Sequence, residues 1–434
     1  MRKMKDSGIE WIGEIPESWN IARVKNLYSF QTGWTPSTGN AAYFDGDIPW
    51  ANISDIGTEK VIYDTAKHIT EEAIEVSSMN LTPKGSLMYS FKLSVGNVSF
   101  CGRDMYTNEA IASFLPNSDN DLRYLYYAAP IFIIKNANEN IYGAKLLNQD
   151  LIKNATVLKL PLAEQIRIAD YLDQKCAEID AIIATKEKTN ELLKERRQSI
   201  IYETVTKGLD PAVPMKDSGI EWIGEIPTHW NTMRLRSKFY FGKGLPITKA
   251  DLRDSGISVI SYGQIHSKHN IGTTIKPELI RYVDTMYLET NASSLVNNGD
   301  FIFADTSEDL SGCGNCVYVD TDYPLFAGYH TMILRSVENT SSKYYSYLFA
   351  TDAWRSQIRA QASGVKLFSI TQKMLRDALL IEPSEEEKVS IVSFLDDMCS
   401  ATDEIISSNE KTIKKLKEYR QSVIYEAVTG KVEI

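Results

Sequence analysis

Several kinds of sequence signal are scarce or missing in this 434-residue chain, and each absence excludes a class of protein. No apolar run reaches the roughly 18 residues that a transmembrane helix needs, so no membrane span is predicted. The first residues, MRKMKDSGIE, lack the apolar stretch of a signal peptide. The five cysteines, Cys101, Cys176, Cys313, Cys316 and Cys399, are too sparse for a disulfide framework and favour a reducing, cytoplasmic location.

Motifs of catalysis and of metal binding are also missing. The chain contains no Walker A loop, no G-x-G-x-x-G, no G-x-S-x-G elbow and no H-E-x-x-H. Cys313 and Cys316 form a lone C-x-x-C without the second pair of ligands that zinc requires. No catalytic residue, metal site or cofactor is therefore predicted, and a stand-alone enzyme is the least favoured class of function.

Two pairs of internal repeats divide the chain into halves. MKDSGIEWIGEIPESWN begins at Met4, and MKDSGIEWIGEIPTHWN begins at Met215; these are called the leading segments. A longer pair begins at Ile166 and Val389 and shares L-D-x-x-C near its start and R-Q-S-x-I-Y-E-x-V-T near its end. Residues 21–160 and 232–382 lie between these repeats and differ from each other; they are called the first and second variable regions.

The longer repeats predict two long helices. Neither copy contains proline or glycine, and Pro161 and Pro383 precede them, as is typical of helix starts. Apolar or small residues recur at a spacing of three and four, which predicts that the helices pair along one seam. The predicted seam residues are Leu172, Cys176, Ile179, Ile183, Leu193, Ile200, Leu395, Cys399, Ile406, Leu416 and Val423. The alternative is that each helix docks only on its own domain.

The order of the repeats predicts a cyclic architecture. If Ile434 lies near Met1, the chain closes on itself with an approximate two-fold axis, and the two helices are antiparallel. The predicted fold is α+β, with domains at 1–160 and 211–382 and helices within 161–210 and 383–434. Short β-type runs such as GSLMYSFKL and GDFIFAD, followed by apolar helical pieces, support α+β variable regions.

The charge of the chain is unevenly distributed. The formal net charge is −10, which by itself disfavours nucleic acid, but residues 228–282 hold nine basic and three acidic residues. Polar and aromatic side chains among them could anchor phosphate and read base edges, although a solvated basic face is an open alternative. The candidates are Lys243, Lys249, Tyr262, Gln264, His266 and Lys268, together with Gly244, whose lack of a side chain could let the backbone approach a phosphate.

The first variable region is less basic. Its candidate contacts lie in three predicted turns and are Trp34, Thr35, Ser37, Asn52, Ser90 and Lys92. Both regions end in a similar turn, YGAKLLNQ and SGVKLFSI, which places Lys145 and Lys366 at matching positions. Each lysine could clamp a nucleic-acid backbone or only shape the turn.

Taken together, the two GIEWIG-x-IP segments, the variable regions and the two R-Q-S-x-I-Y-E-x-V-T helices resemble the specificity subunit of type I restriction–modification systems. The resemblance covers essentially the whole chain. It implies two target recognition domains on antiparallel spacer helices, each reading one half of a bipartite, asymmetric sequence in double-stranded DNA. It also implies two methyltransferase subunits, which bind S-adenosylmethionine, and additional restriction and translocase subunits. A coiled-coil scaffold that joins protein partners without reading DNA is the competing hypothesis.

Overall fold

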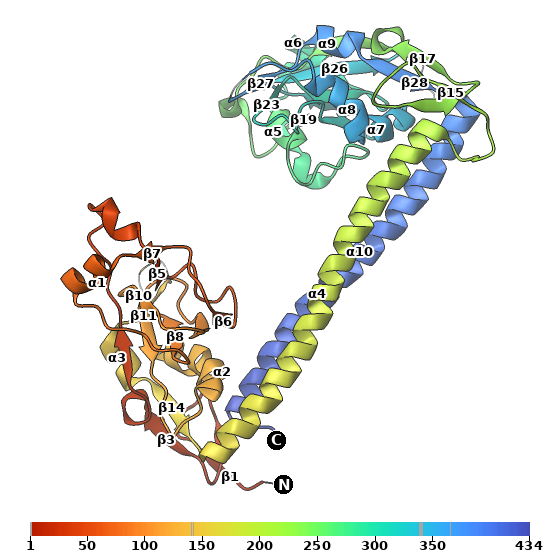
Figure 1. Ribbon diagram of the computed structural model, residues 1–434. Coiled ribbons are helices and arrows are strands. Elements are labelled where there is room, and N and C mark those ends of the chain that lie inside the picture. Colours follow the sequence, from red (N-terminus) through yellow and green to blue (C-terminus); the bar gives the residue numbers. More distant parts are fainter. Residues whose placement is uncertain (1, 140, 142, 338–341, 365) are drawn as a thin grey trace. The chain divides into compact units, whose positions relative to one another are not determined.

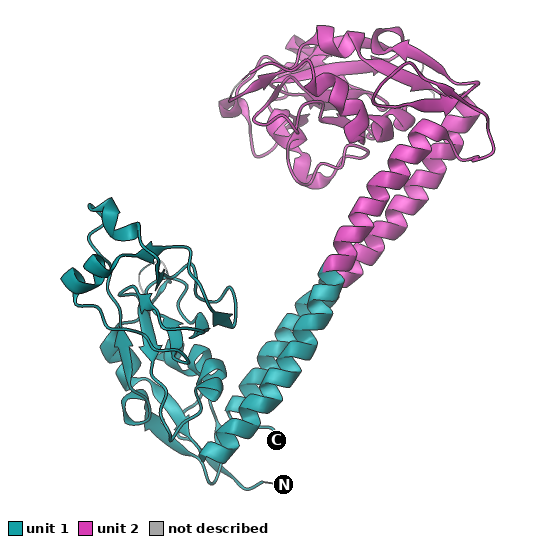
Figure 2. Cartoon of the chain, in the orientation of Figure 1, with its two compact units in different colours: residues 1–187, 410–434 teal, residues 188–409 magenta. Residues whose placement is uncertain are grey.

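The computed structural model describes residues 2–139, 141, 143–337, 342–364 and 366–434. The chain forms two compact units, coloured separately in Figure 2: residues 1–187 with 410–434, and residues 188–409. Each unit contains one variable region and a part of each of two long helices. The predicted domain boundaries lie near the ends of these helices, whereas the compact units divide within them.

The long helices are α4 (Leu162–Lys207) and α10 (Glu385–Val428). At the start of α10, Ser384 and Glu387 cap each other: the backbone N–H of Ser384 donates to Glu387 Oε2 at 3.0 Å, and that of Glu387 donates to Ser384 Oγ at 3.3 Å. Gly208 and Gly430 follow the two helices with φ of 78° and 72°, the left-handed conformation that ends a helix. The helices therefore begin and end close to where the repeats predict.

The two helices run antiparallel in each unit, where Figure 1 shows them side by side. In the first unit Arg420 pairs with Asp180 at 2.9 Å, and Lys417 pairs with Glu187 at 3.3 Å. In the second unit Arg197 pairs with Asp403 at 2.6 Å. Arg197 and Arg420 are equivalent repeat positions, as are Asp180 and Asp403, so the same ion pair occurs once in each unit.

The predicted seam is confirmed in part. Ile179, Ile183, Ile413 and Leu416 form an apolar cluster between the helices. Other predicted seam residues pack toward the variable regions: Leu172, Cys176 and Val423 in the core of the first unit, and Leu395, Cys399 and Ile200 in or against that of the second. Ile406 is buried and Leu193 is half-buried. The helices thus pair with each other in the middle and dock on the variable regions near their ends.

The predicted cyclic order is confirmed by contacts between the two ends of the chain. The first leading segment forms the hairpin β1 (Met4–Asp6) and β2 (Glu14–Pro16), and the second forms β15 (Met215–Asp217) and β16 (Glu225–Pro227). Tyr425 Oη, near the end of α10, donates to the carbonyl of Trp11 at 2.7 Å, and Lys431 Nζ donates to that of Ile12 at 2.7 Å. The equivalent Tyr202 donates to Ile223 at 3.2 Å in the second unit.

The first variable region contains two sheets, a two-stranded ladder and a hairpin. Its elements are β3 (Asn20–Arg23), β4 (Phe30–Thr32), β5 (Ile48–Ala51), β6 (Val61–Ile62), β7 (His68–Ile69), α1 (Glu71–Ser77), β8 (Leu87–Ser90), β9 (Val98–Cys101), β10 (Tyr106–Thr107), β11 (Ile111–Phe114), α2 (Leu122–Phe132), β12 (Asn138–Glu139), β13 (Lys145–Leu146), α3 (Gln149–Asn154) and β14 (Thr156–Lys159). One sheet has the order β4-β11-β8-β9-β6, and the other has the order β10-β5-β7.

The second variable region is built on a similar plan. Its elements are β17 (Asn231–Arg234), β18 (Phe239–Lys243), β19 (Ile257–Ile260), α5 (Tyr262–Ile265), β20 (Arg281–Val283), α6 (Tyr287–Thr290), β21 (Leu295–Val296), β22 (Phe301–Ala304), β23 (Thr306–Ser307), β24 (Cys316–Tyr318), β25 (Leu325–Ala327), β26 (Thr331–Ser336), α7 (Lys343–Ala350), α8 (Asp352–Arg359), β27 (Phe368–Ser369), α9 (Gln372–Asp377) and β28 (Leu379–Glu382). Its sheets are β18-β26-β22-β24 and β20-β19-β25-β21. The order β4-β11-β8-β9 therefore matches β18-β26-β22-β24.

Equivalent contacts anchor each leading segment and each variable region to the helices of its unit. Buried Trp19 donates from Nε1 to Glu164 at 2.6 Å, and buried Trp230 donates to Glu387 at 3.0 Å. The hydroxyls of Tyr124 and Tyr344, likewise buried, donate to the carbonyls of Val428 and Val205 at 3.1 and 2.7 Å. The divergent sequences thus share one frame, which confirms the predicted α+β architecture with an internal repeat.

Candidate nucleic-acid interface

Three strand ends meet at the same place in each variable region. The strand β5 pairs in parallel with β10, and β19 pairs in parallel with β25. After these strands, the N–H of Asn108 donates to Ala51 at 3.0 Å, and the N–H of Gly328 donates to Ile260 at 2.7 Å. Because Asn108 and Gly328 make the same contact, residues 107–111 (TNEAI) of the first variable region correspond to residues 327–331 (AGYHT) of the second. The same correspondence makes the turn after β8 equivalent to the turn after β22, because β8 pairs with β11 as β22 pairs with β26.

A glycine follows β4 and β18 because the chain crosses its own backbone there. A Cβ added to Gly33 would stand 1.6 Å from the carbonyl oxygen of Thr107, and one added to Gly244 would stand 2.0 Å from that of Gly328. The expectation that Gly244 leaves room for a phosphate needs correction, because the protein itself fills that space. Both glycines instead fix the turns around the strand ends.

In the first variable region these turns bring together Thr35, Lys92 and Glu109, which we call the first corner. Thr35 Oγ1 donates to Glu109, and Lys92 Nζ lies 3.6 Å from Glu109 Oε1. The side chains of Lys92 and Glu109 are 49% and 43% exposed. Burial alone would raise the pKa of Glu109, but the hydrogen bond from Thr35 and the positive charge of Lys92 lower it. Glu109 is therefore a charged acceptor at neutral pH.

Trp34 lies beside the first corner with 58% of its surface exposed. Its position is fixed through its backbone: its N–H donates to Thr107 at 2.9 Å, and its carbonyl accepts from Nε1 of the buried Trp50 at 3.0 Å. An exposed indole on a backbone held in this way offers an apolar and stacking surface to a ligand. Trp34 and Thr35 are thus exposed or half-exposed at the place the sequence predicted for them.

In the second variable region the turns after β19, β22 and β25 bring together Tyr262, Asp305 and His330, which we call the second corner. His330 Nδ1 lies 3.2 Å from Asp305 Oδ1, and the side chains are 57% and 34% exposed. The Tyr262 ring lies 5.4 Å from the His330 ring. The backbone of His330 has a φ of 53°, an uncommon conformation for a residue other than glycine.

Other predicted contacts have structural roles of their own. Ser90 is fully buried at the end of β8, and its hydroxyl donates to the carbonyl of Leu93. Ser90 is therefore corrected from a loop tip to an interior residue, and the exposed side chain of this turn is Lys92. Gln264 Oε1 accepts from the N–H of Ser261 at 3.2 Å, so Gln264 caps α5. Asn52 Oδ1 accepts from the N–H of Ser54 at 2.8 Å and shapes the turn after β5.

The remaining predicted contacts lie away from the corners or line a hollow. Ser37, Lys145, Lys243, Lys249, Lys268 and Lys366 are exposed. Lys145 pairs with Glu139 across the β12–β13 hairpin. His266 is half-buried, with Nε2 placed 2.8 Å from the carbonyl of Thr306. Their contact with DNA stays a prediction.

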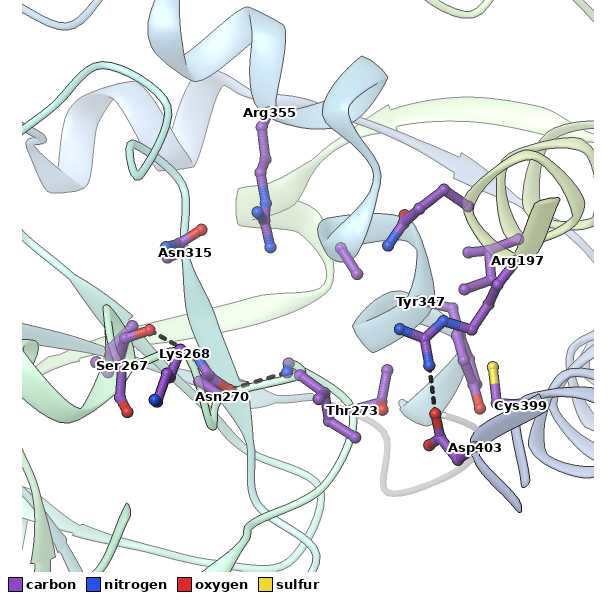
Figure 3. Close-up of a pocket in the computed structure, with 16 residues that line it drawn as sticks. Arg197, Ser267, Lys268, Asn270, Thr273, Asn315, Tyr347, Arg355, Cys399 and Asp403 are labelled. Carbon is purple, nitrogen blue, oxygen red and sulfur yellow. Dashed lines mark hydrogen bonds and ion pairs between the residues drawn. The ribbon is translucent and has the colours of Figure 1, made fainter. Parts of the chain in front are cut away.

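A polar pocket of about 330 Å³ lies in the second unit, where α4 and α10 meet the second variable region (Figure 3). The Arg197–Asp403 ion pair forms one wall, and Lys268 and Asn315 lie on the opposite side. Arg355 reaches into the pocket, with Nε donating to the carbonyl of Phe349 at 2.8 Å. Burial lowers the pKa of Arg355. This lining suits a small anion better than an apolar ligand.

No group of three or more His, Cys, Asp or Glu side chains in the described part of the chain is arranged to hold a metal ion. No helix among the described residues is both long and apolar enough to cross a membrane.

Sequence reasoning missed Glu109, Asp305, Tyr329 and His330. Glu109 lies 17 residues after Lys92, and His330 lies 25 residues after Asp305. Only the pairing of the strands brings the two turns of each corner together. The signal that could have found them is the alignment of TNEAI with AGYHT, which becomes visible only when the flanking strands are matched.

This duplicated frame with divergent corners is the architecture of a DNA specificity protein, and the comparisons with known proteins agree. The family model described as the type I restriction modification DNA specificity domain matches residues 16–194 and 227–416. The chain belongs to this family.

Relatives and solved structures of similar extent support the assignment. The chain is 23% identical over 437 residues to the type I restriction enzyme MjaIX specificity subunit of Methanocaldococcus jannaschii, covering 98% of this chain and 95% of that protein. It is 21% identical over 447 residues to the EcoKI specificity subunit of Escherichia coli, covering 97% and 90%.

Two solved structures share the fold. A chain from a study of complex assembly and conformational transition in a type I R-M system superposes with a TM-score of 0.71 at 14% identity, covering 96% of this chain and 99% of that one. The HsdS subunit from Thermoanaerobacter tengcongensis gives a TM-score of 0.51 at 15% identity, covering 96% and 98%.

Proposed function

We propose that this chain is the specificity subunit of a type I restriction–modification complex and reads a bipartite, asymmetric sequence in double-stranded DNA. One observation carries the proposal: both variable regions use the same strand frame but display different polar side chains at equivalent turns. Two equal frames with unlike reading surfaces suit a target whose two halves differ. Each half-site then requires a few base contacts of about 1–3 kcal/mol apiece.

Phosphate contacts supply the part of the affinity that does not depend on sequence. Nine basic and three acidic residues lie in residues 228–282, although the whole chain has a formal charge of −10. This local excess favours DNA at the second variable region, whereas the acidic remainder disfavours non-specific binding elsewhere. Linking two half-site readers raises the affinity through effective concentration, provided that their spacing matches the target.

The paired helices supply the spacing in this proposal. The helices α4 and α10 contain 46 and 44 residues without interruption, and ion pairs lock their antiparallel register. A matched insertion of about seven residues after Lys188 and after Lys411, which are equivalent repeat positions, adds roughly 10 Å of helix. The unspecified gap in the target is then expected to grow by about three base pairs while both half-sites stay unchanged.

Internal symmetry supports the recruitment of two copies of one partner, which we take to be a methyltransferase subunit. Ile182 and Ile405 occupy equivalent repeat positions and are 48% and 49% exposed. Ile166 and Val389, another equivalent pair, are 37% and 59% exposed. Apolar residues left exposed at the same repeat positions offer two like docking surfaces.

Catalysis belongs to the partners in this proposal. The methyltransferase subunits bind S-adenosylmethionine, flip the target adenine out of the duplex and methylate it, while added restriction and translocase subunits cleave unmethylated DNA. The specificity subunit itself is noncatalytic and holds no cofactor. A complex that modifies chromosomal DNA works in the cytoplasm.

Mapping methylated adenines across the genome, with and without this chain, tests the proposal. The expected result is one bipartite methylated motif that disappears when the chain is deleted. Exchange of residues 21–160 for those of another family member should change one half-site and leave the other intact. An unchanged methylation pattern after deletion would instead favour the coiled-coil scaffold that joins protein partners without reading DNA.

A further inference from the structure

An exposed ion pair joins the same two turns in both variable regions. In the first corner, Lys92 on the turn after β8 faces Glu109 on the turn after β10 at 3.6 Å. In the second corner, Asp305 on the turn after β22 faces His330 on the turn after β25 at 3.2 Å. The nitrogen-bearing side chain lies on the first of the two turns in one region and on the second turn in the other. The equivalent turns therefore carry the nitrogen donor and the carboxylate in opposite order, although the residues themselves are not at aligned positions.

Folding stability does not explain these pairs. Their side chains are between 34% and 57% exposed, and exposed ion pairs contribute little to stability. The backbone beneath them is fixed independently by the crossing at Gly33 and Gly244. Rigid turns that carry solvent-facing donors and acceptors are typical of a recognition surface.

The chemistry of a cation beside a carboxylate matches one edge of DNA. In the major groove guanine offers the acceptors N7 and O6, and cytosine offers its N4 amino group as a donor. Lys92 can donate to guanine while Glu109 accepts from cytosine. In the second corner, the protonated ring of His330 can donate from Nε2 while its Nδ1 faces Asp305, and Asp305 can accept. One G·C base pair can therefore bind at either corner. The guanine must face the first of the two turns in the first corner and the second turn in the second corner, so the base pair has opposite orientations relative to the two sheets.

We propose that the Lys92–Glu109 and Asp305–His330 pairs each read one G·C base pair, in opposite orientations relative to the shared strand frame. This inference rests on the proposed function and deepens it, because it names the side chains that set one position of each half-site. Trp34 and Tyr262, which lie beside these pairs, contact the neighbouring base or sugar.

The test uses the full complex with its methyltransferase subunits and a set of duplexes, each carrying one substituted base pair in the target. The exchange K92E/E109K keeps an ion pair between the two turns but reverses its direction. The preferred base pair at one position of the first half-site should invert from G·C to C·G, and the second half-site should not change. The exchange D305H/H330D should do the same in the second half-site only; aspartate tolerates the left-handed backbone at position 330.

A milder variant keeps the test decisive if an exchange weakens folding. Glu109→Gln retains an oxygen that can accept the hydrogen bond of Thr35 but removes the negative charge. Discrimination against substitution at one base pair should fall about tenfold or more, with the other positions within about twofold of the wild type. Thermal unfolding of the variant should match that of the wild type, which separates reading from stability.

The matched control is the exchange D64H/H68D. Asp64 and His68 form an exposed ion pair of 2.8 Å in the same variable region, outside the first corner. This exchange should leave the preference at every base pair unchanged. The same pattern after D64H/H68D and after K92E/E109K would mean that surface charge, not the corner, sets the preference.

Two results would overturn the inference. One is that E109Q and K92E/E109K leave discrimination unchanged at every position of the target. The other is uniform weakening across all duplexes, which indicates a phosphate contact. Both results are compatible with the proposed function, which fails separately if the wild-type complex methylates no bipartite motif at all.

Discussion

The two variable regions show which features of this chain are under common constraint and which are free to differ. Trp19 and Trp230, at the ends of the leading segments beside these regions, contact equivalent glutamates, and Gly33 and Gly244 allow the same backbone crossing. At the aligned turns, however, Glu109 in one region corresponds to Tyr329 in the other. Buried contacts keep the frame and exposed turns vary, so a new reading surface can arise without a new fold.

Mutations at equivalent positions test this comparison, because they should affect both regions equally. The largest expected effect comes from Trp19→Ala and Trp230→Ala, because both indoles are fully buried and each donates to a helix glutamate. Each substitution should destabilise its own unit by about 3–5 kcal/mol. Urea unfolding followed separately in each unit is the measurement.

Trp34→Ala is the matched control, since the Trp34 indole is 58% exposed. It should change the free energy of unfolding by no more than about 0.5 kcal/mol. A large loss for Trp19→Ala with little loss for Trp230→Ala would contradict the equivalence of the two frames.

A smaller effect is expected at the glycine crossings. Gly33→Ala and Gly244→Ala would each place a Cβ within 2.0 Å of a backbone carbonyl oxygen, so the strand ends must shift. We expect a loss of about 1–3 kcal/mol in each unit, together with weaker recognition of the matching half-site only. Gly263→Ala is the control, because an added Cβ there meets no atom within 4 Å. If Gly33→Ala weakened both half-sites, the corners would not be independent.

The smallest expected effect is on how strongly low pH destabilises each unit. Burial alone would raise the pKa of Glu387, but hydrogen bonds from Trp230, His229 and Ser384 lower it from 4.5 to about 2. The resulting stabilisation is present above pH 4.5 and is lost as the pH falls toward 2. Because a third of the side chain is exposed, we expect about 1–2 kcal/mol rather than the full value of the shift.

Unfolding of the second unit at about pH 6 and about pH 3, in the wild type and in Glu387→Gln, measures this contribution. The variant should lose most of its stability difference between the two conditions, whereas Glu386→Gln, at an exposed neighbour, should not. Glu164, the counterpart in the first unit, also has a lowered pKa, although burial opposes the hydrogen bonds from Arg2 and Trp19. Glu164→Gln should therefore reduce acid sensitivity in the first unit.

The long helices and the cyclic order could be predicted because their signals are local or repeated. Unbroken stretches without proline or glycine predict α4 and α10, and repetition of the leading segment predicts equivalent places around an axis. The seam was predicted less completely, because Leu172 and Leu395 lie where a helix meets both its partner and a variable region. A periodic pattern indicates that a helix face is buried but does not identify what covers it.

The corners could be predicted only in part, because strand register determines them. Lys92 was found as a polar residue in a turn, but nothing in the sequence joins it to Glu109, which lies 17 positions later. Ser90 was misassigned because it lies where the β-type run GSLMYSFKL passes into a predicted turn, and only the structure shows that β8 extends through Ser90 into the interior. Gly244 was read as open to a ligand, although only the folded backbone shows that Gly328 fills the space.

The core of the first unit contains residues from both the beginning and the end of the sequence. The two units therefore fold in a defined order during synthesis. The second compact unit, residues 188–409, is continuous and can fold as soon as it leaves the ribosome. The first unit needs residues 410–434, among them Tyr425 and Val428, so its core stays incomplete until these residues have been made. The half that is made first is therefore the half that matures last, and a polypeptide truncated by a few dozen residues loses its amino-terminal unit rather than its carboxy-terminal one.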